Sequence, residues 1–167
     1  VKGVPASFHG DLQFDNVLYL DNGDFKIIDW RQDFAGLTTH GDLYYDLAKL
    51  YHAIMINGQT ILQDMFDCQI DGNRASVSFY AKSNLVFLNE IFRNFCHKND
   101  YKWFNVELLG ILQYFSICTL YDNFKDGKYG KFLFLYGKYQ LAKLMNRSEN
   151  AETKVNKFIQ KRISTGI

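Results

Sequence analysis

Two short runs near the start of the chain have the composition of β-strands. Residues 16–20 and 25–30 are β-rich runs separated by Asp21-Asn22-Gly23-Asp24. An Asn-Gly pair between two such runs predicts a β-hairpin closed by a two-residue type I′ turn. The register that follows pairs Asp21 with Asp24, Leu20 with Phe25, Leu18 with Ile27, and Asn16 with Asp29.

The rest of the chain is dominated by apolar residues at helical spacing. Asp42 is suited to begin the first helix and Asn57-Gly58 to end it. Residues 66–70 and 74–80 alternate around Asp71-Gly72 and predict a second hairpin. The helix faces predicted from the spacing are Leu43, Leu47, Leu50 and Ile54; Leu85, Leu88, Phe92 and Phe95; Phe104, Leu108, Ile111, Phe115 and Cys118; Phe132, Leu135, Tyr139, Ala142 and Met145; and, in a last short helix, Val155, Phe158, Ile159 and Ile163. We therefore expect an α+β, mostly α fold, with one catalytic-looking β-hairpin followed by a helical bundle, as a single domain over residues 1–167.

Composition narrows the class of protein. Hydrophobic residues make up 47% of the chain and charged residues 22%, a globular balance that excludes a disordered tail. The net charge of +1 gives no field to attract nucleic acid or anionic lipid, so neither partner is expected. Cys68, Cys96 and Cys118 are scattered and predict free core thiols in a reducing compartment. The charge-free apolar stretch 108–121 is too short to cross a bilayer, and we expect a cytoplasmic protein.

Candidate chemistry is concentrated in the first fifty residues. The polar residues there that stand among apolar neighbours are His9, Asp11, Asp15, Asn16, Asp29, Asp33, Asp42 and Asp46. A carboxylate in such a setting is costly unless it is paired, hydrogen-bonded or bound to a cation. The predicted register places Asn16 opposite Asp29, where two oxygen ligands could share Mg²⁺. Asp11, on the loop before this strand, could orient and deprotonate an attacking hydroxyl in phosphoryl transfer.

Three motifs in the same region carry a family resemblance. His9-Gly10-Asp11-Leu12-Gln13-Phe14-Asp15-Asn16 resembles the H-G-D-x-x-x-x-N catalytic loop of the aminoglycoside phosphotransferase and choline kinase superfamily, relatives of protein kinases. Ile27-Ile28-Asp29-Trp30 looks like the metal-binding segment of that family. Gly41-Asp42-Leu43-Tyr44-Tyr45-Asp46-Leu47-Ala48 is similar to its G-D-x-x-x-D-L-A helix start. The match covers residues 8 to about 50 by motif, and the helical remainder agrees with the family's C-terminal lobe in character.

The resemblance implies a role for each matching residue. Asp11 would be the catalytic base, and His9 would organise the catalytic loop. Asn16 and Asp29 would bind Mg²⁺, with ATP as the co-substrate. Asp42 would cap its helix, and Asp46 would brace the loop from that helix. The sequence departs from the commonest family pattern at Gln13, Asp15 and Arg31, which leaves the substrate class open.

The resemblance also implies a particular architecture, a protein-kinase-like C-terminal lobe. The family places a nucleotide-binding N-terminal lobe before the catalytic loop, and the glycine-rich turn and lysine of that lobe are absent from this sequence. The chain is therefore expected to be inactive alone, with the missing lobe as its partner. The apolar face exposed by the lobe's absence is expected to favour dimerisation.

The acceptor is expected to be a small molecule. Only residues 31–41 separate Asp29-Trp30 from the Asp42 cap, which leaves little room for the activation segment of a protein kinase. A sugar, an amino sugar or an amino alcohol would fit, with Asp33 and Trp30 as candidate contacts. Two alternatives stay open: a non-catalytic kinase-like binding or regulatory module, and a metal-dependent hydrolase using His9, Asp11 and Asp29. The pattern assigns no role to His40 or His52.

Overall fold

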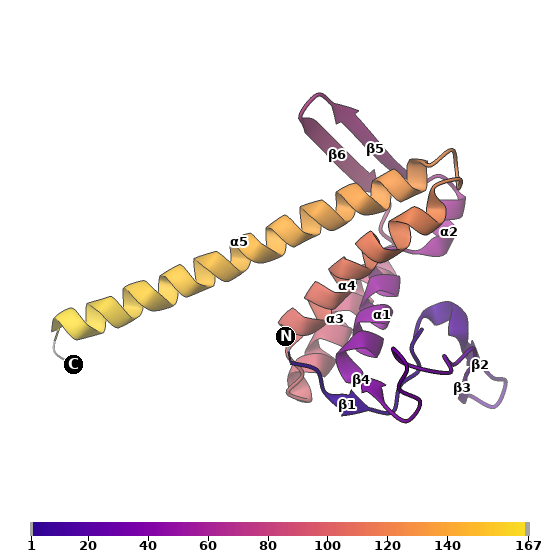
Figure 1. Cartoon of the computed structure of the whole chain (residues 1–167), viewed down its shortest axis with the longest axis horizontal. Helices are drawn as coiled ribbons and strands as arrows, with labels where there is room; N and C mark the ends of the chain where they lie inside the picture. Colours follow the sequence, from indigo (N-terminus) through magenta and orange to yellow (C-terminus); the bar gives the residue numbers. More distant parts are fainter. Residues whose placement is uncertain (1, 166–167) are drawn as a thin grey trace.

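The computed structural model describes the backbone of residues 2–165 and the side chains of residues 2–150. With 53% helix and 16% strand, it confirms the α+β, mostly α class. The elements in chain order are β1 (Pro5–Ala6), the 3₁₀ helix η1 (Phe14–Asn16), β2 (Val17–Tyr19), β3 (Phe25–Ile27), β4 (Gly41–Asp42), α1 (Leu43–Met55), α2 (Gly58–Leu62), β5 (Phe66–Asp71), β6 (Arg74–Phe79), α3 (Ser83–Lys98), α4 (Trp103–Ile117), the 3₁₀ helix η2 (Cys118–Tyr121) and α5 (Lys128–Thr165) (Figure 1).

The hairpin of β2 and β3 forms, but its predicted register is wrong by one residue. The observed pairs are Val17 with Ile27, Leu18 with Lys26 and Tyr19 with Phe25. The turn contains three residues instead of two, because the Gly23 N–H bonds to the Leu20 carbonyl at 2.9 Å. Gly23 has a φ of 88°, the left-handed residue that follows the type I turn in three-residue hairpins.

The observed register changes the relation between Asn16 and Asp29, the two residues expected to bind Mg²⁺. A slip of one residue exchanges the cross-strand neighbours and the faces that they share. The backbone N–H of Ile28, not that of Asp29, bonds to the Asn16 carbonyl at 3.0 Å. Asn16 and Asp29 are therefore not directly opposite each other, and the expectation of a shared face does not follow from strand pairing.

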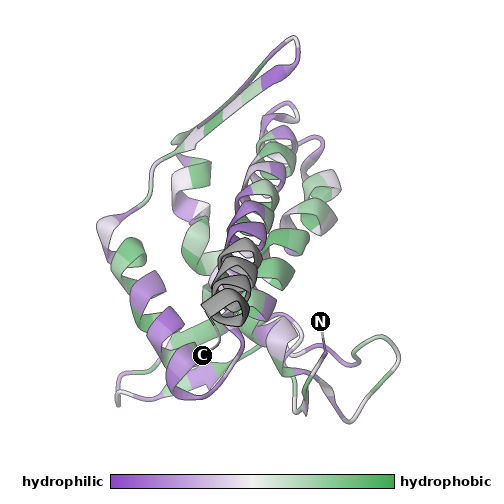
Figure 2. Cartoon of the chain, turned by 90° about the vertical axis from the view of Figure 1, so that its left-hand side faces the viewer, coloured by the Kyte–Doolittle hydropathy of each residue, from purple (hydrophilic) through white to green (hydrophobic). Residues whose placement is uncertain are grey.

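The second hairpin, β5 and β6, is confirmed with its turn at Gly72-Asn73. Its register runs from Phe66 opposite Phe79 to Asp71 opposite Arg74. The hairpin stands out from the helices in both views, and only its base is built into the core (Figures 1 and 2). Phe66 and Phe79 pack there on Phe132 of α5.

Two clusters of buried side chains form the core. One joins α1, α3 and α4 through Tyr44, Leu47, Tyr51, Ile54, Phe92, Cys96 and Val106. The other joins the β5–β6 hairpin with α2, α4 and α5 through Ile56, Ile61, Phe66, Tyr114, Tyr129, Phe132, Leu133 and Tyr136. The helices accordingly carry hydrophobic and hydrophilic residues side by side (Figure 2). The three cysteines are free, as predicted.

The predicted helix faces were only partly right. Phe95 and Phe104 are exposed, whereas Cys96, Val106 and Tyr114 are buried. Tyr139 and Met145 of α5, also predicted to face the core, are exposed as well. The reason for α4 is that it packs against both α1 and α5. A helix with two buried sides has no single apolar stripe for the spacing to reveal.

The last two predicted helices are one continuous helix, α5. No glycine or proline occurs between residues 138 and 165, so nothing in the sequence ends the helix there. The apolar face predicted for Val155, Phe158, Ile159 and Ile163 lies outside the residues whose side chains are described.

One described segment, Trp103–Tyr121, is long and apolar enough to cross a membrane by length and composition. It is longer than the stretch 108–121 considered from the sequence. A core helix of a soluble protein has the same character, and α4 within this segment packs on α1 and α5. The segment is therefore weak evidence for a membrane span.

Candidate functional site

The loop of residues 9–16 is held to α1 by one carboxylate. Asp46 accepts hydrogen bonds from the backbone N–H groups of His9 at 2.6 Å and Gly10 at 2.8 Å. Gly10 has a φ of 81°, and a Cβ on this residue would lie 2.7 Å from the Arg31 Cβ. The loop therefore requires glycine at this position. The bracing contact expected of Asp46 is present.

His9 uses both ring nitrogens within the fold. Its Nε2 lies 2.8 Å from the Ile28 carbonyl, which can only accept, and its Nδ1 accepts the Asp11 N–H at 3.1 Å. These contacts require the neutral tautomer with the proton on Nε2. Trp30 packs on the ring at a centroid distance of 4.9 Å. His9 thus fixes the loop to the hairpin and has no lone pair left for a proton or a metal.

Asp11 is a buried carboxylate between two cations. Lys49 Nζ lies 3.0 Å from Oδ1, and Arg31 Nη2 lies 3.1 Å from Oδ2. Burial raises the pKa of Asp11, but the hydrogen bonds and charges of Lys49 and Arg31 outweigh burial and lower the pKa overall. The carboxylate is therefore ionised near neutral pH and can orient a hydroxyl, although its low pKa makes it a weak base.

The two residues expected to bind Mg²⁺ differ in their surroundings. Asn16 is buried and donates from Nδ2 to the Asp11 carbonyl at 2.9 Å, which leaves its Oδ1 as an acceptor. Asp29 is exposed and has a φ of 58°, which is uncommon for a residue other than glycine and is often found at functional sites. Among the described residues, no group of three or more His, Cys, Asp or Glu could hold a metal ion. The donors present fit Mg²⁺ by type, as two oxygen ligands whose shell water and phosphate would complete.

The remaining predicted residues lie around the loop. Asp42 caps α1, as expected, by accepting the Tyr44 N–H at 3.0 Å. Asp33 is exposed and accepts the Gly36 N–H at 2.8 Å. Asp33 also lines a cavity of about 390 Å³ with Gly10, Arg31 and Lys49. Trp30 is more than half exposed, and its Nε1 donates to the Ile27 carbonyl at 3.2 Å.

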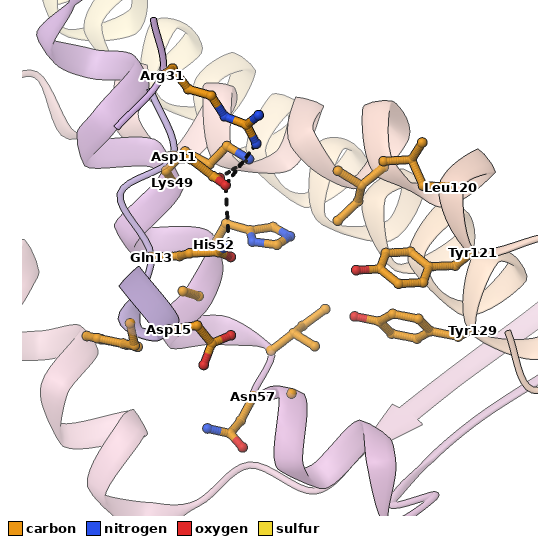
Figure 3. A pocket seen from close by; sticks show the side chains of 15 residues that line it. Asp11, Gln13, Asp15, Arg31, Lys49, His52, Asn57, Leu120, Tyr121 and Tyr129 are labelled. Atoms are coloured by element: carbon orange, nitrogen blue, oxygen red, sulfur yellow. Dashed lines mark hydrogen bonds and ion pairs between the residues drawn. The ribbon is translucent and has the colours of Figure 1, made fainter. Parts of the chain in front are cut away.

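A second cavity, of about 380 Å³, is lined in part by Asp11. Loop 11–15 and α1 supply Asp11, Gln13, Asp15, Lys49 and His52, and the opposite wall comes from the region between α4 and α5 (Figure 3). Leu120, Tyr121 and Tyr129 lie on that opposite wall. After the expectation that an acceptor hydroxyl binds beside Asp11, we call this space the acceptor-side cavity. Its volume suits a small organic molecule.

Sequence reasoning missed part of this cavity. Lys49 was not considered, Arg31 was noted only as a departure from the family pattern, and His52 was given no role. A signal was available for α1, because Asp46, Lys49 and His52 follow one another at intervals of three on a helix. No comparable signal existed for Tyr121 and Tyr129, which come from a distant part of an aromatic-rich chain.

Comparisons with protein-family models, with curated proteins and with solved structures found no match.

Proposed function

We propose that this chain is the catalytic-loop half of an ATP-dependent phosphotransferase acting on a hydroxyl of a small molecule, with the architecture of a protein-kinase-like C-terminal lobe. The observation that carries the proposal is Asp11: its carboxylate lies in the wall of the acceptor-side cavity, on a loop that Asp46 and His9 hold in place. The three sequence motifs support the same interpretation.

Asp11 would act on the acceptor hydroxyl. A hydroxyl in the cavity donates to the Asp11 carboxylate, which orients its oxygen toward the γ-phosphorus of ATP. The oxygen–phosphorus bond forms as the bond between the γ-phosphorus and the β–γ bridging oxygen breaks, and the hydroxyl proton passes to Asp11. ADP is the leaving group.

Asn16 of the loop and three residues beside it would stabilise the charge of the phosphate. Asn16 and Asp29 supply the oxygen ligands that would hold Mg²⁺, which neutralises phosphate charge when bound. Lys49 and Arg31 lie within 3.1 Å of the Asp11 carboxylate and add positive charge beside the position of the transferred phosphate. A separate nucleotide-binding lobe is part of this proposal, because the 167 residues contain no glycine-rich turn with a following lysine of the family's kind.

A small acceptor fits the loop that follows the hairpin. Residues 33–37 close on themselves, since Phe34 and Leu37 exchange backbone hydrogen bonds of 2.7 and 3.1 Å. Because the middle of the eleven-residue segment 31–41 is closed in this way, the segment offers no extended surface for a peptide. We therefore expect sugars, amino sugars or amino alcohols, rather than proteins, to be phosphorylated.

The second candidate is a non-catalytic binding or regulatory module. The observation in its favour is the double ion pair of Asp11, which weakens this carboxylate as a base. The metal-dependent hydrolase has less support, because both nitrogens of His9 are engaged by the Ile28 carbonyl and the Asp11 N–H.

The test compares Asp11→Asn with Asp24→Asn in the gene product that carries these residues. Asp24 is an exposed residue of the hairpin turn and serves as a matched control. Transfer of phosphate from ATP is measured with peptides and with a panel of small hydroxyl compounds. We expect Asp11→Asn to lower kcat by about 10²–10⁴-fold and Asp24→Asn to leave it unchanged. Activity of Asp11→Asn within a few-fold of the wild type would contradict the role of Asp11 as the catalytic base. Absence of any phosphate transfer by the wild type would favour the non-catalytic binding module.

A further inference from the structure

The charges around the acceptor-side cavity cancel. Among the described residues that line it, Asp11 and Asp15 are the carboxylates, and Lys49 and Arg31 are the cations. Both cations are already bonded to Asp11, and Asp15 is exposed to water. A cationic amine entering the cavity would find no buried carboxylate free to pair with it, and it would lose hydration without compensation.

The aromatic residues present hydroxyl groups to the cavity. The Tyr129 ring is surrounded by Phe66, Tyr121, Phe124 and Phe132, with centroid distances from 4.8 to 6.2 Å. Figure 3 shows the hydroxyl ends of Tyr121 and Tyr129 directed into the cavity. Burial raises the pKa of Tyr129, so its hydroxyl stays protonated and can donate. A quaternary ammonium is bound by ring faces, whereas these two residues direct their hydroxyl ends into the cavity.

His52 supplies a buried polar atom that has no partner in the described part of the chain. Its ring extends from α1 toward Leu120 and Tyr121 (Figure 3). It packs on Tyr114 at a centroid distance of 4.7 Å, and its Nε2 has no hydrogen-bond partner among the described residues. Buried polar atoms almost always have a partner, so a group is expected that supplies one. His52 lines the cavity, so a molecule bound there is placed to supply that group.

The His52 ring is also uncharged at neutral pH. Burial and the charge of Lys49 lower the pKa of His52 to about 4, although Asp11 acts in the opposite direction. A neutral imidazole has one N–H and one lone pair, so it can both donate to and accept from hydroxyl groups. It has no net charge to attract an anion.

We infer that the acceptor-side cavity binds a neutral polyhydroxylated compound, a sugar or a polyol, and that His52 selects it by hydrogen bonding together with the hydroxyls of Tyr121 and Tyr129. The inference deepens the proposed function, since it rests on the bound compound being the acceptor of the phosphotransferase. Among the acceptors considered above, it favours sugars over amino sugars and amino alcohols.

The test is binding to the 167-residue chain, measured without ATP. The probes are D-glucose, myo-inositol and glycerol as neutral compounds, and D-glucosamine and choline as cationic ones. Each is titrated while the imidazole signals of 15N-labelled histidine are followed by NMR. We expect at least one neutral probe to shift the His52 signals and to bind more tightly than either cation. Tighter binding of choline or glucosamine, or no shift of His52 with any probe, overturns the inference.

Two variants separate hydrogen bonding from packing. His52→Phe keeps a ring against Tyr114 without the nitrogens, and it should weaken binding of the neutral probe about tenfold, the loss of one buried hydrogen bond. His52→Gln restores a polar group at a similar reach and should recover part of the affinity. His40→Phe, at an exposed position outside the cavity, is the control. Unchanged binding by a folded His52→Phe chain contradicts the assignment.

The outcome is distinct from that of the phosphotransferase proposal. If a neutral probe binds through His52 but no phosphate is transferred to it from ATP by the gene product, the proposed function fails and the binding site stands. If phosphate is transferred to an amine-containing acceptor while His52→Phe has no effect, the proposed function stands and this inference fails.

Discussion

The Asp46 side chain holds loop 9–16 by two hydrogen bonds to its backbone. Its carboxylate is buried and accepts from two consecutive N–H groups, those of His9 and Gly10. Hydrogen bonds to a charged acceptor are stronger than neutral ones. The position of Asp11, which follows directly, depends on this contact.

Replacing Asp46 with Asn should therefore destabilise the protein. The amide can accept with one oxygen only, and its NH₂ group would face a backbone N–H. We expect the free energy of unfolding in urea to fall by about 1–3 kcal/mol. Glu90→Gln, on the exposed side of α3, is the control and should change stability by less than about 0.5 kcal/mol. Equal effects of the two substitutions would show that the bracing contact contributes nothing.

Two residues of the cavity, His52 and Asp11, predict that the stability of the fold decreases in two separate ranges of pH. His52 has its pKa lowered from 6.5 to about 4 in the folded chain. Between these values the unfolded state binds more protons, so stability should fall as the pH falls, by up to about 3 kcal/mol. Asp11 has a lowered pKa, so its contribution is present above about 3.8 and is lost only as the pH falls further, through its folded pKa.

Urea unfolding of the wild type, His52→Phe and Asp11→Asn at pH 7, 5, 4 and 3 separates the two windows. His52→Phe should lack the loss between pH 7 and 4, and Asp11→Asn should lack part of the loss below pH 4. Parallel curves for the wild type and His52→Phe down to pH 4 would show that His52 is not held neutral by the fold.

At the scale of elements, a glycine permits the packing of α4 against α1. A Cβ on Gly110 would lie 2.7 Å from Cδ1 of Tyr51 and 3.5 Å from the Ala48 carbonyl. Tyr51 is buried and packed against Trp103, so its ring has little room to move. This contact positions α1, which carries Asp46, Lys49 and His52.

Gly110→Ala should accordingly lower stability by about 1–3 kcal/mol, although alanine is the better helix former. Gly58→Ala at the start of α2 is the matched control, because a Cβ there meets nothing within 4 Å. We expect the control to be neutral or slightly stabilising in urea unfolding. If Gly110→Ala is as stable as the wild type, α1 and α4 can move apart with no loss of stability.

Local signals in the sequence were sufficient for several elements and insufficient for others. The β5–β6 hairpin, the Asp42 cap and the Asp46 contact were predicted because each depends on residues near in sequence or on a motif. The β2–β3 register was not, since Asp21-Asn22-Gly23 allows a two- or a three-residue turn and the choice depends on the surrounding fold. The face of α4 and the far wall of the acceptor-side cavity depend on tertiary packing, which periodicity does not encode.

At the scale of the whole molecule, loop 9–16 and the acceptor-side cavity are present, whereas the 167 residues contain no glycine-rich turn with a following lysine of the kind that the proposed nucleotide-binding lobe would supply. The β2–β3 hairpin beside the loop also exposes Leu18, Tyr19, Phe25, Ile27 and Trp30. This is where the apolar face expected to meet another lobe, or a second copy, would lie. The prediction of an inactive but folded chain follows from this arrangement.

The test is calorimetric titration of ATP·Mg²⁺ into the 167-residue chain, with a parallel turnover assay. Together they measure whether the chain alone binds the nucleotide and transfers phosphate. We expect no micromolar affinity and no turnover, because Asn16 and Asp29 alone leave most of the metal shell and the whole nucleoside without contacts. A cooperative urea transition of the same sample is the control for folding. Micromolar affinity or steady turnover would show that a second lobe is dispensable.

Loop 9–16 is held both by α1 and by the β2–β3 hairpin, and this arrangement has a consequence for amide hydrogen exchange. The amide protons of His9 and Gly10 are held by α1, whereas that of Asp11 is held by the His9 ring, which is itself bonded to the hairpin. Amide exchange with deuterated water requires that such contacts open. The amide protons of His9 and Gly10 should exchange when α1 opens. The amide proton of Asp11 should exchange when β2 and β3 fray. Adjacent residues would then report on two separate motions, with Asp11 at the boundary between them.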